Sequence, residues 1–139
     1  MNTNEAINFL SKHQPMPADS ALTQEIIDQY DNVRKYFIQH PDIKAIPFFL
    51  RSFGDGNGWG VYQVVEDFFY RCPHDEVVLA IKTVLEDETI PDSVRYWTTQ
   101  AAAAFSDNIL RRGISLSLAS ANEDIKEAAL LALEVLDGS

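Results

Sequence analysis

The chain has a single cysteine, Cys72, and it lacks both long apolar runs and an N-terminal leader pattern. One cysteine cannot form a disulfide within the chain, which suits a reducing compartment. No run of about 18 apolar residues occurs, so no membrane-spanning helix is predicted. The first residues have neither the basic region nor the apolar region of a signal peptide, and we therefore expect a cytoplasmic protein.

Basic residues are also scarce. Eleven lysines and arginines stand against 21 aspartates and glutamates, which gives a formal net charge of −10. Such a protein repels phosphate groups, so nucleic acid is not expected as a ligand. The same charge would speed encounter with a basic protein, although acidity also serves simply to keep a small protein soluble.

Motifs that support catalysis are missing as well. His13, His40 and His74 lie in predicted breaks, and none has a second ligand at the spacing of a helical zinc site. The chain has no phosphate-binding Walker loop and no Gly-x-Ser-x-Gly turn. Cys72 falls on an apolar stripe, which favours a buried, inert thiol. We therefore expect neither an enzyme nor a bound cofactor or metal.

The chain does contain one apolar pattern three times, at offsets of about 32 residues. Within each copy the apolar positions follow the spacing i, i+3, i+4, i+7, i+8, i+11, which places them on one side of an α-helix. We call these residues the stripe: Val61, Val64, Val65, Phe68, Phe69 and Cys72; Val94, Trp97, Thr98, Ala101, Ala102 and Phe105; and Ile125, Ala128, Ala129, Ala132, Leu133 and Leu136.

The pattern predicts an all-α protein of one domain, residues 1–139. Two helices, the second capped by Asp19 or Ser20 and running to about residue 39, are expected to form an N-terminal cap over residues 1–41. Residues 42–137 are predicted to form three helical hairpins, each with a stripe helix second, that stack as an α-solenoid.

Two segments resemble the second helix of HEAT-like repeats. Residues 91–102 and 123–133 each have an acidic residue, then Val-Arg or Ile-Lys, then spaced alanines. The proline-bearing segment 46–50 resembles the first helix of such a repeat. The resemblance, which covers about residues 42–137, implies a HEAT-like α-solenoid.

The first repeat departs from the HEAT-like pattern. Tyr62 stands where a basic residue is usual, and Phe68 and Phe69 replace small residues. These larger side chains predict a wider gap beside the first stripe helix, which we expect the N-terminal helices to fill.

In HEAT-like stacks the second helices generally line the concave face, so the resemblance also suggests where a partner would bind. Exposed tyrosines around an acidic residue suit recognition of a basic protein, whereas tyrosines packed against the N-terminal helices would be purely structural. The predicted partner-binding residues are Tyr62, Glu66, Tyr70, Arg95, Tyr96, Thr99 and, in the glycine-rich loop, Trp59.

The glycine-rich loop, residues 54–60, allows three interpretations. Asp55, Asn57, Gly60 and Glu66 match EF-hand positions, but Trp59 occupies a ligand position and cannot coordinate calcium. The other interpretations are an elongated turn and a loop that exposes Trp59 as an interface anchor.

The small size, acidity and single-domain layout resemble immunity proteins of bacterial toxin systems, including contact-dependent growth inhibition. This resemblance implies a non-enzymatic protein that neutralises a basic toxin domain. A HEAT-like adaptor or assembly factor for another protein is the alternative. HEAT-like DNA glycosylases and bilin lyase-like proteins form a third class, which the acidity and the single buried cysteine disfavour.

Overall fold

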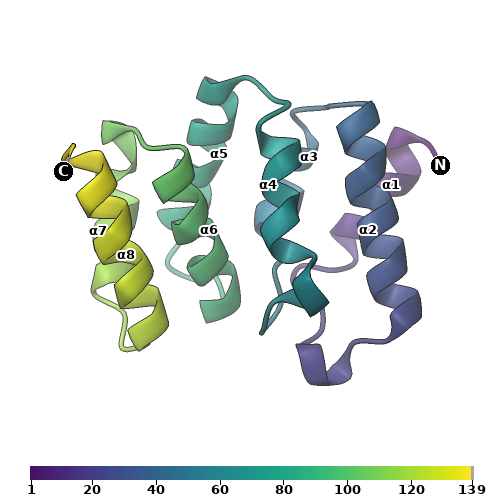
Figure 1. Cartoon of the computed structure of the whole chain (residues 1–139), viewed down its shortest axis with the longest axis horizontal. Helices are drawn as coiled ribbons and strands as arrows, with labels where there is room; N and C mark the ends of the chain where they lie inside the picture. Colours follow the sequence, from purple (N-terminus) through teal and green to yellow (C-terminus); the bar gives the residue numbers. More distant parts are fainter. Residues whose placement is uncertain (139) are drawn as a thin grey trace. The chain divides into compact units, whose positions relative to one another are not determined.

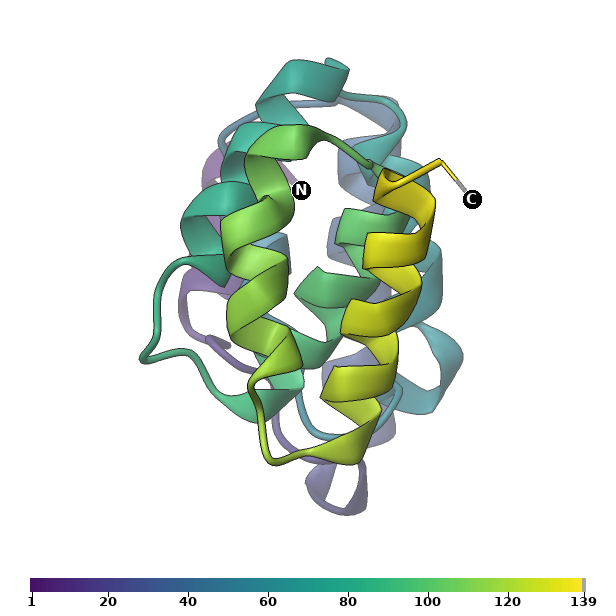
Figure 2. The same ribbon diagram turned by 90° about the vertical axis from the view of Figure 1, so that its left-hand side faces the viewer.

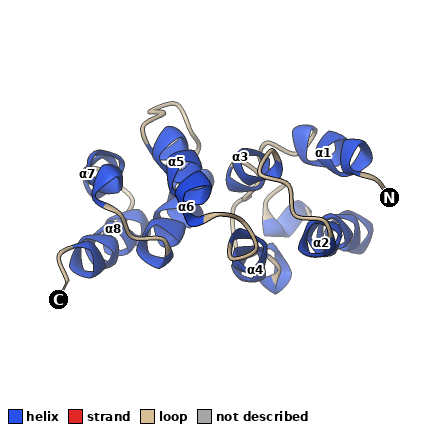
Figure 3. Ribbon diagram, turned by 90° about the horizontal axis from the view of Figure 1, so that it is seen from above, coloured by secondary structure: helices blue, strands red, loops and turns tan. Residues whose placement is uncertain are grey.

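The computed structural model describes residues 1–138, and within that range it contains helices and loops but no strand (Figure 3). The all-α class predicted from the sequence is confirmed. The α-helices are α1 (Thr3–Ser11), α2 (Gln24–Gln39), α3 (Ala45–Leu50), α4 (Glu66–Phe69), α5 (His74–Leu85), α6 (Asp92–Ala104), α7 (Arg111–Leu118) and α8 (Glu123–Leu136). Short 3₁₀ turns are η1 (Asp19–Ala21), η2 (Gly58–Gly60), η3 (Tyr62–Val65) and η4 (Asn108–Leu110).

The helices form two compact units, one spanning Met1–Pro73 and the other beginning at His74. The first unit contains the expected N-terminal cap together with the first expected hairpin. The second unit contains the other two hairpins. A single domain in which all three hairpins stack remains a prediction.

Aromatic side chains fill the core of the first unit. Helix α1 packs against α2 and α3, and α2 packs against α4 (Figure 1). Phe37 of α2, Phe49 of α3 and Phe68 of α4 meet there, with ring centroids 5.9 Å (Phe37–Phe49), 5.7 Å (Phe37–Phe68) and 5.1 Å (Phe49–Phe68) apart. The expectation that the N-terminal helices fill the space beside Phe68 is confirmed.

Two local predictions in the first unit are wrong. The first stripe helix is not one continuous α-helix, because Tyr62–Val65, which contains the β-branched Val64 and Val65, forms the 3₁₀ turn η3 before α4. Helix α2 is not capped by Asp19 or Ser20. Its N-cap is Thr23, whose hydroxyl accepts a hydrogen bond from the Ile26 N–H at 3.2 Å.

The stripe lies on the protected sides of the helices. None of its residues is exposed in either unit, so the helical periodicity correctly identifies the buried sides of the helices. In the second unit α6 packs against α8 through small side chains, including Ala102 and Ala129, and α7 lies beside α8 (Figure 2). Gly113 of α7 allows close approach to α5, since a Cβ there would lie 2.5 Å from Cβ of Leu85.

A buried arginine links three elements of the second unit. Arg95 of α6 is only 8% exposed. Its Nη1 donates to Oγ of Ser117 in α7 at 2.9 Å, and its Nη2 donates to the carbonyl oxygens of Leu85 at 3.0 Å and Asp87 at 3.1 Å. The Thr99 hydroxyl lies 2.9 Å from the same Ser117 oxygen. Arg95 therefore satisfies carbonyl groups where α5 ends, which that helix cannot satisfy itself.

We expect Arg95→Ala to lower the free energy of unfolding by about 2–3 kcal/mol, because buried carbonyl and hydroxyl groups lose their donor. Urea denaturation would measure the change. Arg112→Ala is the control, since that side chain is 79% exposed and its Nε lies 3.9 Å from a Glu86 oxygen; its effect should stay below about 0.5 kcal/mol. Equal losses for the two variants would contradict the role given to Arg95.

Candidate protein-binding site

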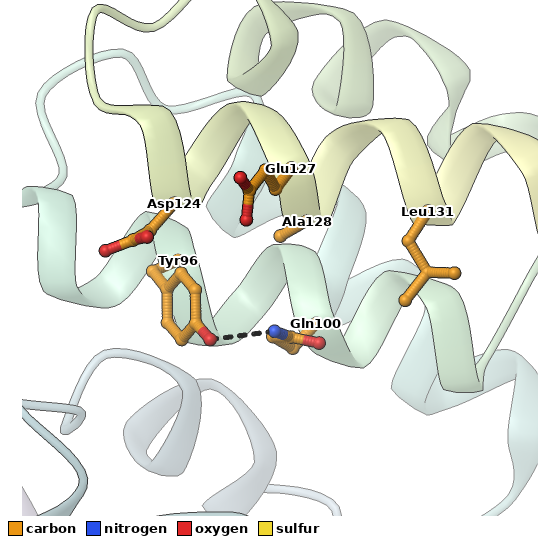
Figure 4. A pocket seen from close by; sticks show the side chains of 6 residues that line it. All are labelled: Tyr96, Gln100, Asp124, Glu127, Ala128 and Leu131. Atoms are coloured by element: carbon orange, nitrogen blue, oxygen red, sulfur yellow. Dashed lines mark hydrogen bonds between the residues drawn. The ribbon is translucent and has the colours of Figure 1, made fainter.

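A hollow of about 220 Å³ opens on the second unit between α6 and α8 (Figure 4). Two of its residues come from α6 and four come from α8. The lining residues are Tyr96, Gln100, Asp124, Glu127, Ala128 and Leu131.

The N-terminal part of α8 places two carboxylates in the hollow. Asn122 caps this helix, and its side-chain oxygen accepts a hydrogen bond from the Ile125 N–H at 3.1 Å. Asp124 lies in the first turn, where the helix dipole favours a negative charge. Glu127 and Leu131 follow Asp124 by three and seven residues and therefore share its side of the helix.

Helix α6 contributes a fixed aromatic ring. Nε2 of Gln100 donates to the hydroxyl oxygen of Tyr96 at 2.9 Å, which holds both side chains across one turn. The Gln100 amide oxygen lies on the side away from Tyr96 (Figure 4). The Tyr96 ring also meets the Trp97 ring edge to face, with centroids 5.3 Å apart.

The hollow carries unneutralised negative charge. Neither Asp124 nor Glu127 forms an ion pair within residues 1–138. The basic side chains of the second unit are engaged elsewhere: Lys82 and Arg112 with Glu86, Arg111 with Asp137, Lys126 with Glu123, and Arg95 in the buried network.

An apolar surface continues from the hollow along α8. Leu131 is 48% exposed, and Val135, one turn later on the same side, is 43% exposed. This surface therefore places an apolar patch next to unpaired carboxylates. Protein interfaces commonly contain both kinds of contact.

Three of the predicted partner-binding residues are buried, so the prediction that they line an exposed face is wrong. Arg95 and Thr99 belong to the buried network. Tyr62 is 1% exposed, and its ring lies 5.7 Å from that of Tyr30 and 5.4 Å from that of Phe53. Burial raises the pKa of Tyr62 to about 12. For Tyr62 the structural alternative, packing against an N-terminal helix, is confirmed.

The other predicted residues lie at accessible positions. Tyr96 is half-buried and lines the hollow, whereas Glu66 and Tyr70 belong to the first unit. Tyr70 is 60% exposed. Partial burial and the neighbouring Glu66 carboxylate raise the pKa of Tyr70. A role of Glu66 and Tyr70 in binding stays a prediction.

Gln100, Asp124, Glu127 and Leu131 were not predicted. A regular signal marks three of these four positions: Gln100, Glu127 and Leu131 stand two or six residues after the start of a stripe, as Tyr96 does. The prediction used the positions one, five and nine residues after each start, and added Tyr96 beside them. One residue turns an α-helix by about 100°, and in α6 that step separates buried Arg95 and Thr99 from the partly exposed Tyr96 and Gln100.

The glycine-rich loop is an elongated turn closed by Asp19. The Asp19 carboxylate accepts hydrogen bonds from the N–H groups of Asn57 at 3.0 Å and Gly58 at 2.9 Å. The residues that would complete an EF-hand loop are helical in η3 and α4. This geometry is not that of a calcium loop, because the backbone amides already face a carboxylate and Glu66 begins a helix.

Trp59 projects from this turn in an unusual backbone conformation. Its φ of +52° lies in the left-handed region, which disfavours a bulky side chain. Its side chain is 48% exposed, and the indole Nε1 donates to the Asp19 carbonyl oxygen at 3.3 Å. The interpretation of Trp59 as an interface anchor stays a prediction.

We expect Trp59→Gly to be more stable than Trp59→Ala by about 1 kcal/mol, because both remove the indole but only glycine removes the cost of a positive φ. Thermal and urea unfolding of the two variants, with the unchanged chain as reference, would measure this. Equal stability of the two variants would show that the backbone at residue 59 carries no such cost.

Cys72 is partly buried and does not behave as an activated thiol. Burial, reinforced by the negative charge of Asp42, raises the pKa of Cys72 to about 11. The thiolate is the reactive form of cysteine, so little of it is present near neutral pH.

Alkylation of Cys72 at pH 8 should be about a hundredfold slower in the folded chain than in the unfolded chain, because an ordinary thiol has a pKa near 8.5. The rate should rise with pH up to about 11. Mass spectrometry after timed iodoacetamide treatment, with and without urea, would follow it. Equal rates in the two states would contradict the raised pKa.

Comparison of the chain with protein-family models, curated proteins and solved structures finds no match. Within residues 1–138, no helix has both the length and the apolar character needed to cross a bilayer. The same range contains no group of three or more histidine, cysteine, aspartate or glutamate side chains placed to hold a metal ion. A functional assignment therefore depends on the chemistry of the exposed surface.

Proposed function

We propose that this chain is a non-enzymatic binding protein whose partner is a basic protein domain. The observation that carries the proposal is the pair of unpaired carboxylates, Asp124 and Glu127, in a hollow beside half-buried Tyr96 and exposed Leu131. The carboxylates would attract a cation, and the ring and leucine would exclude water from the contact.

The charge of the whole chain supports this partner chemistry. A net charge of −10 raises the rate of encounter with a basic surface and opposes encounter with an acidic one. A stable interface buries about 1,600 Å² in total, so the hollow and the apolar side of α8 would form only its centre.

We propose further that the three hairpins stack as a HEAT-like α-solenoid. The similar spacing of the three stripes, whose starts at residues 61, 94 and 125 are 33 and 31 residues apart, and the absence of exposed residues among them support this arrangement. Such a stack would present the second helices of the hairpins as one extended surface.

The partner class that we propose is a bacterial toxin domain, which makes this chain an immunity protein acting in the cytoplasm. Its small size, acidity and lack of catalytic motifs support that role. A toxin that acts on nucleic acid is itself basic, and an acidic partner can cover the surface that binds its substrate.

The test is co-expression with a toxic C-terminal domain of a large secreted protein encoded immediately upstream of this gene. We expect rescue of growth and co-purification of the two chains. The affinity should fall as salt is added, because exposed charges are screened. Co-purification with another client but no rescue would favour an adaptor, and failure of both would overturn the proposal.

The double variant Asp124→Asn with Glu127→Gln should weaken the complex at least about tenfold, since two attractive charges are lost. Glu123→Gln is the control, because it removes one charge from the same helix turn but lies outside the hollow and pairs with Lys126. Calorimetry would measure both affinities. Equal weakening per charge removed would indicate general electrostatic attraction and no specific role for the hollow.

A further inference from the structure

We propose that the hollow between α6 and α8 binds the guanidinium group of an arginine side chain. This inference rests on the proposed function, because the arginine would belong to the partner protein. It goes further in naming the side chain that the hollow recognises.

No basic side chain among the described residues of this unit neutralises the two carboxylates of the hollow. Asp124 and Glu127 form no ion pair within residues 1–138, and each basic side chain of the second unit already has a partner elsewhere. The two carboxylates stand three residues apart on one side of α8, so a single cation between them can interact with both.

The lining favours a flat cation over a compact one. The ring of Tyr96 forms part of the lining, and a guanidinium group can stack on an aromatic face while its edge N–H groups reach carboxylates. A lysine ammonium group is a point charge with three donors and cannot combine both contacts as well.

The hollow also suits the remainder of an arginine side chain. Ala128 and Leu131 provide an apolar wall next to the carboxylates, against which the three methylene groups could lie. The hydrogen bond from Gln100 to Tyr96 holds the ring in place, so little side-chain freedom would be lost on binding.

A direct test uses the full chain labelled with ¹⁵N and titrated with Nα-acetyl-arginine N-methylamide at constant ionic strength. The lysine and citrulline analogues are titrated in parallel. We expect amide shifts confined to residues of α6 and α8 around the hollow. The lysine analogue should bind at least about threefold more weakly than the arginine analogue. Citrulline, which has the arginine shape without its charge, should cause no localised shift.

Three results would overturn the proposal: no shift at the hollow up to the solubility limit, equal binding of the lysine analogue, or equal binding of the citrulline analogue. The first would show that the hollow takes no cation. The second would remove the selectivity for a flat group, and the third would remove the role of charge.

Matched variants assign the contacts. Glu127→Gln should weaken binding of the arginine analogue about fivefold, whereas Glu123→Gln should weaken it less than about twofold. Tyr96→Leu should abolish the preference for arginine over lysine, and Tyr96→Phe, which keeps the ring, should retain it. Equal effects of Glu127→Gln and Glu123→Gln would place the binding outside the hollow.

Binding to the toxin domain separates this inference from the proposed function. If the domain binds and Glu127→Gln leaves its affinity unchanged, the arginine site is wrong while the function stands. If the arginine analogue shifts the hollow residues and no toxin domain is neutralised, the site stands and the proposed function fails.

Discussion

One buried polar side chain, together with the stripe beside it, fixes the orientation of α6. Three hydrogen bonds from Arg95, to Ser117 and to the carbonyl groups of Leu85 and Asp87, hold this residue against α5 and α7. Because consecutive helix residues differ in direction by about 100°, fixing Arg95 inward turns Tyr96 toward the outside. The direction of the half-buried ring that lines the hollow is therefore tied to a polar contact in the interior, and the stability and the surface of this unit are coupled.

Periodicity alone identifies the buried sides of the helices. The stripe is correct in both units because apolar residues at helical spacing must leave water, whatever lies opposite them. The periodicity does not predict the burial of Arg95, one residue after the start of the second stripe. An arginine next to the stripe looks exposed in the sequence, and only the tertiary structure supplies the carbonyl groups that make its burial favourable.

Other outcomes of the sequence analysis also have physical causes in particular residues. The N-terminal helices were expected to fill the gap beside Phe68, and Phe37 does so, because large aromatic side chains need a partner surface. The left-handed backbone of Trp59 was not expected, since propensity disfavours it, and it depends on the Asp19 carboxylate that closes the turn. The hollow combines side chains more than 20 residues apart, so the pattern within each helix marks their positions but does not show that they meet.

The repulsion between the two carboxylates of the hollow bears on how a partner would bind. Like charges three or four residues apart on a helix destabilise it by about 0.2–0.5 kcal/mol. Asp124 and Glu127 are held in this relation by α8, and no cation within residues 1–138 relieves it. A bound cation would remove the repulsion as well as form its own contacts. The repulsion between Asp124 and Glu127 is present in the unbound protein and is relieved when a cation binds. Helix α8 therefore favours the binding of a basic partner by holding the two carboxylates close together.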